Sequence, residues 1–373
     1  MKIAFCNRPL WNNPLGGDGV QMLKTKEYLE QEFKLEIEIV TSPEQLDSSY
    51  DIVHVFNFVT WKITESFYKK ALELDIPIVG SSIFWDYTFA YDRITNLFVT
   101  NKMSSLSAYF LKLFIHVSVT LTGYPFFLSR KFRKKVNYFV CNSKVVLPNS
   151  IEEGQLLLNF IQKKDFASKI HIVYNGAENS ANEVHLPEEL FLHKYSIPSG
   201  YILQVGRIEP VKNQINLVYA LKDNPTIPIV FVGRIANYKY YEKLRKLSGR
   251  RGNVYFIDAV PHDEITAFYK YAVIHVLLSL RESPGLVSLE ALCNECPIVI
   301  SSANYVPVST YFPDQKYIVD PFDICDIKNV ILKAYSEREL HNDLIEKFSW
   351  KVAAQQTYDA YKKYFHNIDS LFS

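Results

Sequence analysis

The stretch that decides the fold lies near the middle of the chain and reads YILQVGRIEPVKNQINLVYAL at residues 201–221. Its first five residues are mostly apolar, as in a buried strand, and a glycine follows them at once. Ile215, Val218 and Leu221 then recur with helical spacing. A strand, a tight turn and a helix in this order form the repeating unit of parallel sheets, so the stretch predicts an α/β fold.

The same alternation of strand-like and helix-like segments runs along the whole chain. We expect strands at residues 3–6, 35–40, 51–56, 76–81, 145–147 and 170–174, and then at 201–205, 227–232, 254–257, 273–278, 297–301 and 317–319. Helical patterns lie at 20–31, 61–74, 151–162 and 350–365, and Ser150 suits the N-cap of the third, with Glu153 as its capping-box partner. Residues 178–200, rich in Asn, Glu, Pro and Ser, have the composition of a linker. The sequence therefore predicts two Rossmann-like domains facing a central cleft, with the ligand between them.

Composition excludes several classes of protein. The 373 residues are 48% hydrophobic, enough for two cores, and a net charge of +1 gives no field that would recruit nucleic acid. The five cysteines are odd in number and scattered, which favours a reducing compartment over a disulfide framework. Cys293 and Cys296 have zinc-like spacing, but no further pair of ligands follows them, so we expect no metal site.

Three segments of the sequence bear on the cellular location of the protein. Residues 1–6 run directly into a strand pattern without the order of an export signal, which predicts a cytoplasmic protein. The apolar segment 106–128 contains Lys112 and His116, so we expect a helix that does not span a membrane. Aromatic residues and cations in Tyr124–Lys135 fit the anionic inner face of the cell membrane, although a buried helix followed by a solvated basic turn explains them equally well.

The turn after residue 205 carries the first candidate site. Gly206 lets the backbone turn sharply, and Pro210 suits the first turn of a helix. Arg207 and Lys212 flank this helix start, where free N–H groups and added cations would attract a diphosphate. The alternative is that both cations are ordinary solvated surface residues.

A second loop, at residues 279–292, carries two glutamates. Glu282 precedes the expected helix and Glu290 lies one turn inside it, near its buried side. A buried carboxylate needs hydrogen-bond donors, and sugar or ribose hydroxyls would supply them. Two glutamates at this spacing are also common on ordinary helices, so the spacing alone is weak evidence.

Together these loops resemble the retaining glycosyltransferases of family 4, which have the GT-B fold. The family hallmark of two glutamates separated by seven residues appears as Glu282-Ser-Pro-Gly285-Leu286-Val-Ser-Leu-Glu290, and its Gly-Arg and Lys signature appears at Gly206, Arg207 and Lys212. Further similar segments are residues 147–150 (LPNS), 173–176 (VYNG) and 348–350 (FSW). The resemblance implies an acceptor domain at 1–178, a donor domain at 179–354, and a last segment, 355–373, that returns to the first domain.

The resemblance also implies a role for each matched residue. Arg207 and Lys212 would hold the diphosphate of a nucleoside-diphosphate sugar, and Gly285 and Leu286 would offer it backbone N–H groups. Glu290 would bind the ribose, and Glu282 would contact hydroxyls of the sugar. The sugar would pass to a glycan or lipid-linked acceptor in polysaccharide or glycolipid assembly. No cofactor or metal is expected, because the chain contains no Asp-x-Asp pair.

The first half of the chain supplies the remaining candidates. Gly16 and Gly17 precede a helix, and in the family a glycine-rich loop here touches the donor phosphates. The family often has a His-Asp pair after the fourth strand, whereas this chain has Trp85 and Asp86. We expect Asp86 to be catalytic together with Glu282 and to face the acceptor. Trp85, which would stack on a sugar ring, and His54 and Asn57 from the preceding strand are acceptor-side candidates. A structural role remains an alternative for each of these four residues. A non-catalytic nucleotide-sugar binding protein and a GT-B sugar-nucleotide epimerase also stay open.

Overall fold

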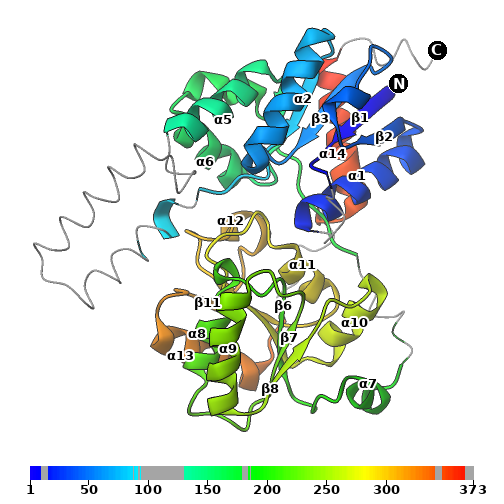
Figure 1. Ribbon diagram of the computed structural model, residues 1–373. Coiled ribbons are helices and arrows are strands. Elements are labelled where there is room, and N and C mark those ends of the chain that lie inside the picture. Colours follow the sequence, from blue (N-terminus) through cyan, green and yellow to red (C-terminus); the bar gives the residue numbers. More distant parts are fainter. Residues whose placement is uncertain are drawn as a thin grey trace, which may run out of the picture. The chain divides into compact units, whose positions relative to one another are not determined.

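The computed structural model describes residues 1–9, 16–86, 88–90, 93, 130–178, 184, 186–340 and 347–365. The chain divides into two compact units, each built on its own parallel sheet (Figure 1). The N-terminal unit comprises Met1–Asn175 and Trp350–Ser373, and the C-terminal unit comprises Gly176–Ser349. The division thus falls a few residues before each boundary expected from the sequence.

The N-terminal unit contains a five-stranded sheet in the order β2-β1-β3-β4-β5, with every neighbouring pair parallel. The strands are β1 (Lys2–Cys6), β2 (Glu36–Val40), β3 (Ile52–Phe56), β4 (Ile78–Ser81) and β5 (Val145–Val146). The strand expected at 170–174 is wrong. Only a single bridge joins Ile170 to Val146. The His171 and Val173 N–H groups donate to the Val146 and Pro148 carbonyls, but Pro148 has no N–H to donate in return.

Helices cover both faces of this sheet. They are α1 (Gly17–Phe33), α2 (Trp61–Glu73), α5 (Arg130–Asn142), α6 (Ile151–Ile161) and α14 (Trp350–Tyr364), with 3₁₀ turns η1 (Pro43–Gln45), η2 (Phe58–Thr60) and η4 (Lys164–Lys169). Ile3 and Phe5 of β1 pack with α1 and α14, whereas Ala4 and Cys6 pack with α2, α5 and α6 (Figure 1). The two-residue period of the strand thus divides the core into two layers.

The C-terminal unit contains a six-stranded parallel sheet in the order β11-β10-β9-β6-β7-β8. The strands are β6 (Ile202–Val205), β7 (Ile229–Val232), β8 (Val254–Ile257), β9 (Ile274–Leu277), β10 (Ile298–Ser301) and β11 (Ile318–Val319). The helices are α7 (Glu188–Tyr195), α8 (Gln214–Ala220), α9 (Tyr238–Arg251), α10 (His262–Tyr271), α11 (Leu286–Cys293), α12 (Val308–Tyr311) and α13 (Ile324–Glu337), with the 3₁₀ turn η6 (Pro210–Lys212). All six strands predicted for this half of the chain are confirmed.

The segment expected to be a linker contains a helix instead. Phe191 of α7 is buried against the rings of Phe268 and Tyr271, at centroid distances of 4.8 and 5.3 Å. Glu188 and Glu189 lie in the first turn of α7 and His193 and Lys194 in its last, as the helix dipole favours. The polar composition of this segment therefore reflects a short surface helix anchored by one aromatic side chain.

A buried carboxylate ties the loop after β4 to the start of α6. Ser150 caps α6 as expected, accepting a hydrogen bond from the Glu153 N–H at 3.0 Å. The Glu153 carboxylate does not complete a capping box, because it accepts hydrogen bonds from the Phe84 N–H at 2.8 Å, the Asn149 N–H at 3.1 Å and the Ser82 hydroxyl. The carboxylate thereby fixes the loop that carries Trp85 and Asp86.

A side chain of α1 joins two of the segments that carried the family resemblance. The Gln21 amide donates to the Asn149 side chain at 2.9 Å, and its oxygen accepts from the Asn175 amide at 3.2 Å. All three side chains are buried. Residues 147–150 and 173–176 therefore build one polar network inside the N-terminal unit.

Glu153→Gln should destabilise the N-terminal unit by about 1–3 kcal/mol, because the amide presents a donor where backbone N–H groups already point. Denaturant unfolding of the variant measures this loss. Glu73→Gln, at an exposed position of α2 in the same unit, is the matched control and should shift the free energy of unfolding by less than about 0.5 kcal/mol. Equal stability of the two variants would contradict the role given to the buried carboxylate.

Candidate functional site

The two loops that carried the sequence argument lie side by side in the C-terminal unit. They follow β6 and β9, which are neighbours in the sheet and pair Leu203 with His275. Beyond the strands, the Leu280 N–H donates to the Val211 carbonyl at 2.8 Å, which joins one loop to the other. The carboxyl ends of adjacent parallel strands are where α/β proteins bind ligands.

An ion pair connects the candidate residues of these two loops. The Lys212 ammonium lies 2.5 Å from the Glu282 carboxylate, and their side chains are only 16% and 11% exposed. Gly206, at φ 141°, lies under the Lys212 side chain, whose Cε would be 3.5 Å from a Cβ at this position. Arg207 is 52% exposed and instead pairs with Glu209 at 2.8 Å. The structure thus brings Gly206, Lys212 and Glu282 together and leaves Arg207 at the edge of the cluster.

The helix expected to begin at Pro210 begins four residues later. Pro210–Lys212 form the 3₁₀ turn η6, Asn213 is left-handed, and α8 starts at Gln214. The Ile215 N–H in the first turn of α8 already donates to the Tyr240 hydroxyl at 3.0 Å. An anion at this place would therefore be held mainly by the cations and not by free N–H groups of α8, which corrects the argument from the helix start.

Glu290 is held from outside its own loop. Gly285 is the N-cap of α11 and Leu286 its first residue, which places Glu290 in the second turn. The Tyr269 hydroxyl of α10 donates to the Glu290 carboxylate at 3.0 Å. Burial, and then the charge of Glu290, raise the pKa of Tyr269 well above its usual range, so Tyr269 remains a donor. This contact could not be predicted from the sequence, because the two residues lie on different helices.

A second glycine, which the sequence argument missed, supports Gly206. Gly233 follows β7 at φ 144°, and a Cβ at this position would lie 2.4 Å from the Gly206 carbonyl oxygen. The Gly206 N–H also donates to the Val232 carbonyl at 2.9 Å. The turn that carries Arg207 and Lys212 therefore requires close approach of two backbones, which only glycine allows.

In the N-terminal unit, the glycine loop meets Asn57 through an acidic side chain. Gly16 is the N-cap of α1 and Gly17 its first residue. Asp18 accepts a hydrogen bond from the Asn57 amide at 3.3 Å and pairs with Arg8 at 3.4 Å. Asp18 and Arg8 were not predicted from the sequence, although they belong to this cluster beyond the ends of β1 and β3.

His54 does not lie at the end of its strand and is removed from the acceptor-side candidates. It is buried in the middle of β3, where Nδ1 contacts the Tyr361 hydroxyl at 2.6 Å and Nε2 contacts the Ser81 hydroxyl at 2.8 Å. Burial lowers the pKa of His54 to about 3, so the ring is neutral. Both ring nitrogens are thus used for contacts with hydroxyl groups inside the core of the N-terminal unit.

Trp85 and Asp86 differ in how far their side chains are exposed to a ligand. Trp85 is only 4% exposed, which leaves little ring surface for stacking on a sugar and corrects that expectation. Asp86 is partly exposed, and its carboxylate accepts a hydrogen bond from the Thr88 N–H at 2.9 Å. Asp86 therefore remains a candidate, held in a local turn.

The basic segment is described only from residue 130 onward, so the Tyr124 end of the expected membrane surface and the apolar stretch 106–128 lie outside the described residues. Arg130, Lys131, Arg133 and Lys134 are exposed on α5, and Lys135 pairs with Glu65 at 2.7 Å. Among the helices of the described ranges, none has the length and apolar character needed to cross a bilayer. Within the same ranges, no three His, Cys, Asp or Glu side chains gather as ligands of a metal ion.

Residues 194–348 match the family model of glycosyl transferases group 1. This segment of the C-terminal unit is therefore similar to glycosyl transferases group 1. The match begins within α7 and ends just before α14, so the matched segment contains Gly206, Arg207, Lys212, Glu282 and Glu290.

Curated relatives match about half of the chain. The O-antigen chain mannosyltransferase B of Escherichia coli is 29% identical over 189 residues, which are 46% of this chain and 48% of that protein. The serotype-specific mannosyltransferase WbdA of Escherichia coli is 25% identical over 185 residues, 46% of this chain and 22% of WbdA. A D-inositol 3-phosphate glycosyltransferase of Corynebacterium glutamicum is 25% identical over 252 residues, 60% and 58% of the two chains. Each match covers less than two thirds of the relative.

Solved structures match the chain over both units. Sucrose-phosphate synthase from Thermosynechococcus elongatus superimposes with a TM-score of 0.71 at 15% identity, over 98% of this chain and 99% of that one. HepE from Anabaena, in complex with UDP-glucose, gives a TM-score of 0.66 at 14% identity over 98% and 95%. The two α/β units with parallel sheets therefore have the fold of GT-B glycosyltransferases.

Gly233→Ala should destabilise the C-terminal unit by at least about 1–3 kcal/mol, because an alanine at this φ is strained and its Cβ meets the Gly206 carbonyl. Gly249→Ala is the matched control, since nothing lies within 4 Å of the added Cβ in the last turn of α9. The control should stabilise the protein by about 0.5–1 kcal/mol. Denaturant unfolding of both variants measures the contrast, and a harmless Gly233→Ala would refute the close approach.

Proposed function

We propose that this protein is a retaining glycosyltransferase of family 4 that transfers a sugar from a nucleoside-diphosphate sugar to a glycan or lipid-linked acceptor. The observation that carries the proposal is the pairing of Lys212 with Glu282 inside the matched domain, next to the helix that presents Glu290. A cation beside a hydroxyl-binding carboxylate suits a ligand that joins a diphosphate to a sugar.

Each group of the bound nucleotide sugar would replace a contact that the protein makes within itself when no ligand is bound. The diphosphate would take the Lys212 ammonium from Glu282, and Arg207 would turn towards it from its exposed position. Glu282 would then accept hydrogen bonds from sugar hydroxyls, so that its charge is not left without a partner. Glu290, oriented by Tyr269, would accept from the ribose, and the N–H groups of Gly285 and Leu286 would face the diphosphate.

Transfer would proceed on one face of the sugar. The acceptor oxygen would bond to the anomeric carbon while the bond from that carbon to the phosphate oxygen breaks, and the acceptor proton would pass to the departing diphosphate. The share of the protein would be charge stabilisation of this leaving group by Lys212 and Arg207, and orientation of both substrates. Asp86 and Asn57 would serve the acceptor, and Gly16 and Gly17 would approach the donor phosphates.

The acceptor class is proposed from the relatives and from a basic helix. The names of two relatives place them in O-antigen and serotype-specific mannosyl transfer, which supports a role in cell-surface polysaccharide or glycolipid assembly. The exposed cations at the start of α5 would hold the protein peripherally at the cytoplasmic face of the membrane, near a lipid-linked acceptor.

The function is tested first by binding and turnover. A thermal-shift screen of UDP, GDP and ADP and of their hexose conjugates should identify one stabilising nucleotide, and the protein should then slowly hydrolyse the matching donor without acceptor. Tight binding without any turnover would favour a nucleotide-sugar binding protein. Conversion of the donor to an epimer, with release of free nucleotide and no acceptor, would favour an epimerase. Absence of binding to every nucleotide would refute the proposal.

Glu290→Ala should weaken binding of the nucleoside diphosphate by roughly 1.5–3 kcal/mol, because the ribose hydroxyls lose a charged acceptor. Calorimetric titration with the nucleotide found in the screen measures the loss. Glu189→Ala, at an exposed position of α7, is the control and should leave the affinity unchanged. An unchanged affinity in Glu290→Ala as well would remove Glu290 from the site.

Transfer should continue in excess EDTA, because Lys212 and Arg207 would neutralise the leaving diphosphate in place of a divalent cation. Lys212→Ala should reduce turnover far more than chelation does, whereas Lys333→Ala, a surface substitution on α13, should have no effect. The measurement is the initial rate of nucleotide release with and without EDTA. Activity that disappears on chelation and returns with magnesium or manganese would overturn this account of the diphosphate.

A further inference from the structure

One helix of the C-terminal unit carries a row of cations that neither the fold nor the candidate site uses. Lys239, Lys243, Lys246 and Arg250 are all exposed on α9. With 3.6 residues per turn, their side chains fall within about 60° of one another around the helix axis and extend over about 16 Å along it. The buried residues of α9, which are Leu244, Ser248 and Arg251, lie on the opposite side.

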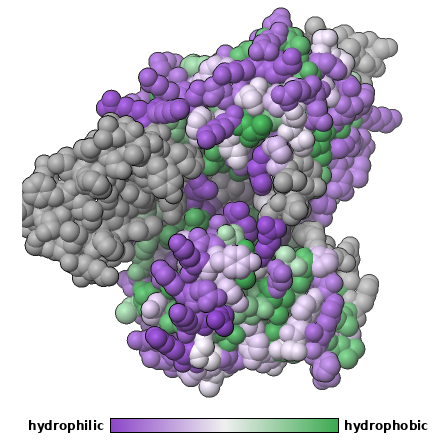
Figure 2. Space-filling model, in the orientation of Figure 1, coloured by the Kyte–Doolittle hydropathy of each residue, from purple (hydrophilic) through white to green (hydrophobic). Residues whose placement is uncertain are grey.

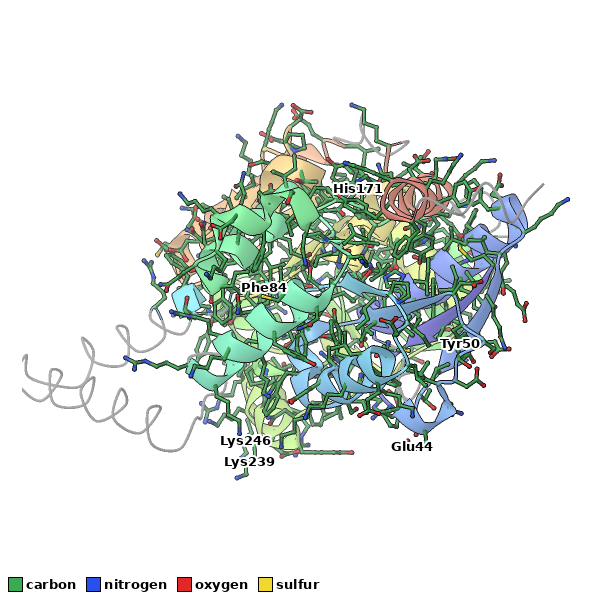
Figure 3. The ribbon with its side chains drawn as sticks, turned by 90° about the horizontal axis from the view of Figure 1, so that it is seen from above. Glu44, Tyr50, Phe84, His171, Lys239 and Lys246 are labelled. Carbon is green, nitrogen blue, oxygen red and sulfur yellow. The ribbon has the colours of Figure 1, made fainter. Side chains whose placement is uncertain are left out.

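Figure 3 shows Lys239 and Lys246, two turns apart on α9, pointing away from the ribbon of their own unit. Hydrophilic side chains cover the part of the C-terminal unit over which α9 runs (Figures 1 and 2). The row therefore faces solvent.

On three other helices, lysines pair with carboxylates of the same helix. Lys24 pairs with Glu27 and Lys26 with Glu30 on α1, Lys69 with Glu65 on α2, and Lys333 with Glu337 on α13, each three or four residues apart. On α9 the single carboxylate, Glu242, pairs with Arg245 at 3.3 Å. None of the four cations in the row forms an ion pair with a carboxylate in the described part of the chain.

The row therefore places like charges next to one another. Lys239 and Lys243 are four residues apart, Lys243 and Lys246 three, and Lys246 and Arg250 four. Like charges at these spacings disfavour a helix, so helix stability does not explain the pattern. The whole chain carries a net charge of only +1, and the excess on α9 is thus local.

We propose that this exposed face of α9 is a docking surface for an anionic lipid bilayer. A straight row of cations on a convex helix contacts a plane along its full length, whereas single-stranded nucleic acid is bound in grooves with aromatic platforms. Three of the four cations are lysines, which attract a charged surface without the forked geometry that arginine offers to individual phosphates. Tyr238, 72% exposed at the start of the same helix, is a residue type enriched at membrane interfaces.

The surface is distinct from the basic start of α5, which belongs to the other unit, and it does not depend on the proposed glycosyl transfer. A vesicle assay measures binding alone, so its outcome is independent of any sugar donor. Each cation near an anionic membrane contributes about fivefold in affinity, which makes loss of four readily measurable.

The test compares three forms of the full chain in co-sedimentation with phosphatidylcholine vesicles, with and without phosphatidylglycerol. The wild type should bind only the anionic vesicles, and less so at high salt. A variant with glutamine at Lys239, Lys243, Lys246 and Arg250 should bind them roughly tenfold or more weakly. The matched control has glutamine at Lys24, Lys26, Lys316 and Lys333, which changes the net charge equally, and it should bind like the wild type.

A second variant guards against misfolding of the first. Lys243→Glu gives both Lys239 and Lys246 an opposite charge three or four residues away, so it should keep or raise the melting temperature while weakening vesicle binding. Equal binding by wild type and both α9 variants, or loss of binding in the control alone, overturns the proposal. Preference of the wild type for single-stranded RNA over anionic vesicles, lost in the α9 variants, overturns it in favour of a nucleic-acid surface.

Discussion

The candidate site depends on the ion pair between Lys212 and Glu282. Each charge is largely removed from water, so each would be costly without the other, and together they hold the loops after β6 and β9 against one another. Lys212 crosses the turn at Gly206, and the backbone of this turn is approached closely by Gly233. A ligand that offers an anion to Lys212 and hydrogen-bond donors to Glu282 can replace the pair. A ligand that contacts only one of them leaves the other charge buried without a partner.

In the N-terminal unit, a buried carboxylate holds a loop in place. Glu153 accepts hydrogen bonds from the Phe84 and Asn149 N–H groups and from the Ser82 hydroxyl. Gln21 links Asn149 to Asn175 by hydrogen bonds between amide side chains. These contacts join the loop after β4, the start of α6 and residues 173–176 within one unit.

Most of the fold could be predicted from the sequence because strand and helix periodicities are local. All six strands of the C-terminal unit, five of the six proposed for the N-terminal unit, and the last helix were predicted from such patterns. The exception at 170–174 is informative, since a strand also needs a partner with backbone donors, and Pro148 opposite this segment has none. The residues of the candidate site were indicated by the resemblance, and the structure brings Gly206, Lys212 and Glu282 together.

By itself, the sequence determined the alternation of strands and helices, and hence two parallel sheets, because buried segments must be apolar at the period of their own secondary structure. Only the tertiary structure decided which polar side chains meet. It placed His54 in the core against Tyr361, which is distant in the sequence, and it set Tyr269 behind Glu290. The physical reason is that a hydrogen bond or an ion pair depends on the distance between two groups in space. This distance cannot be predicted from the number of residues between them.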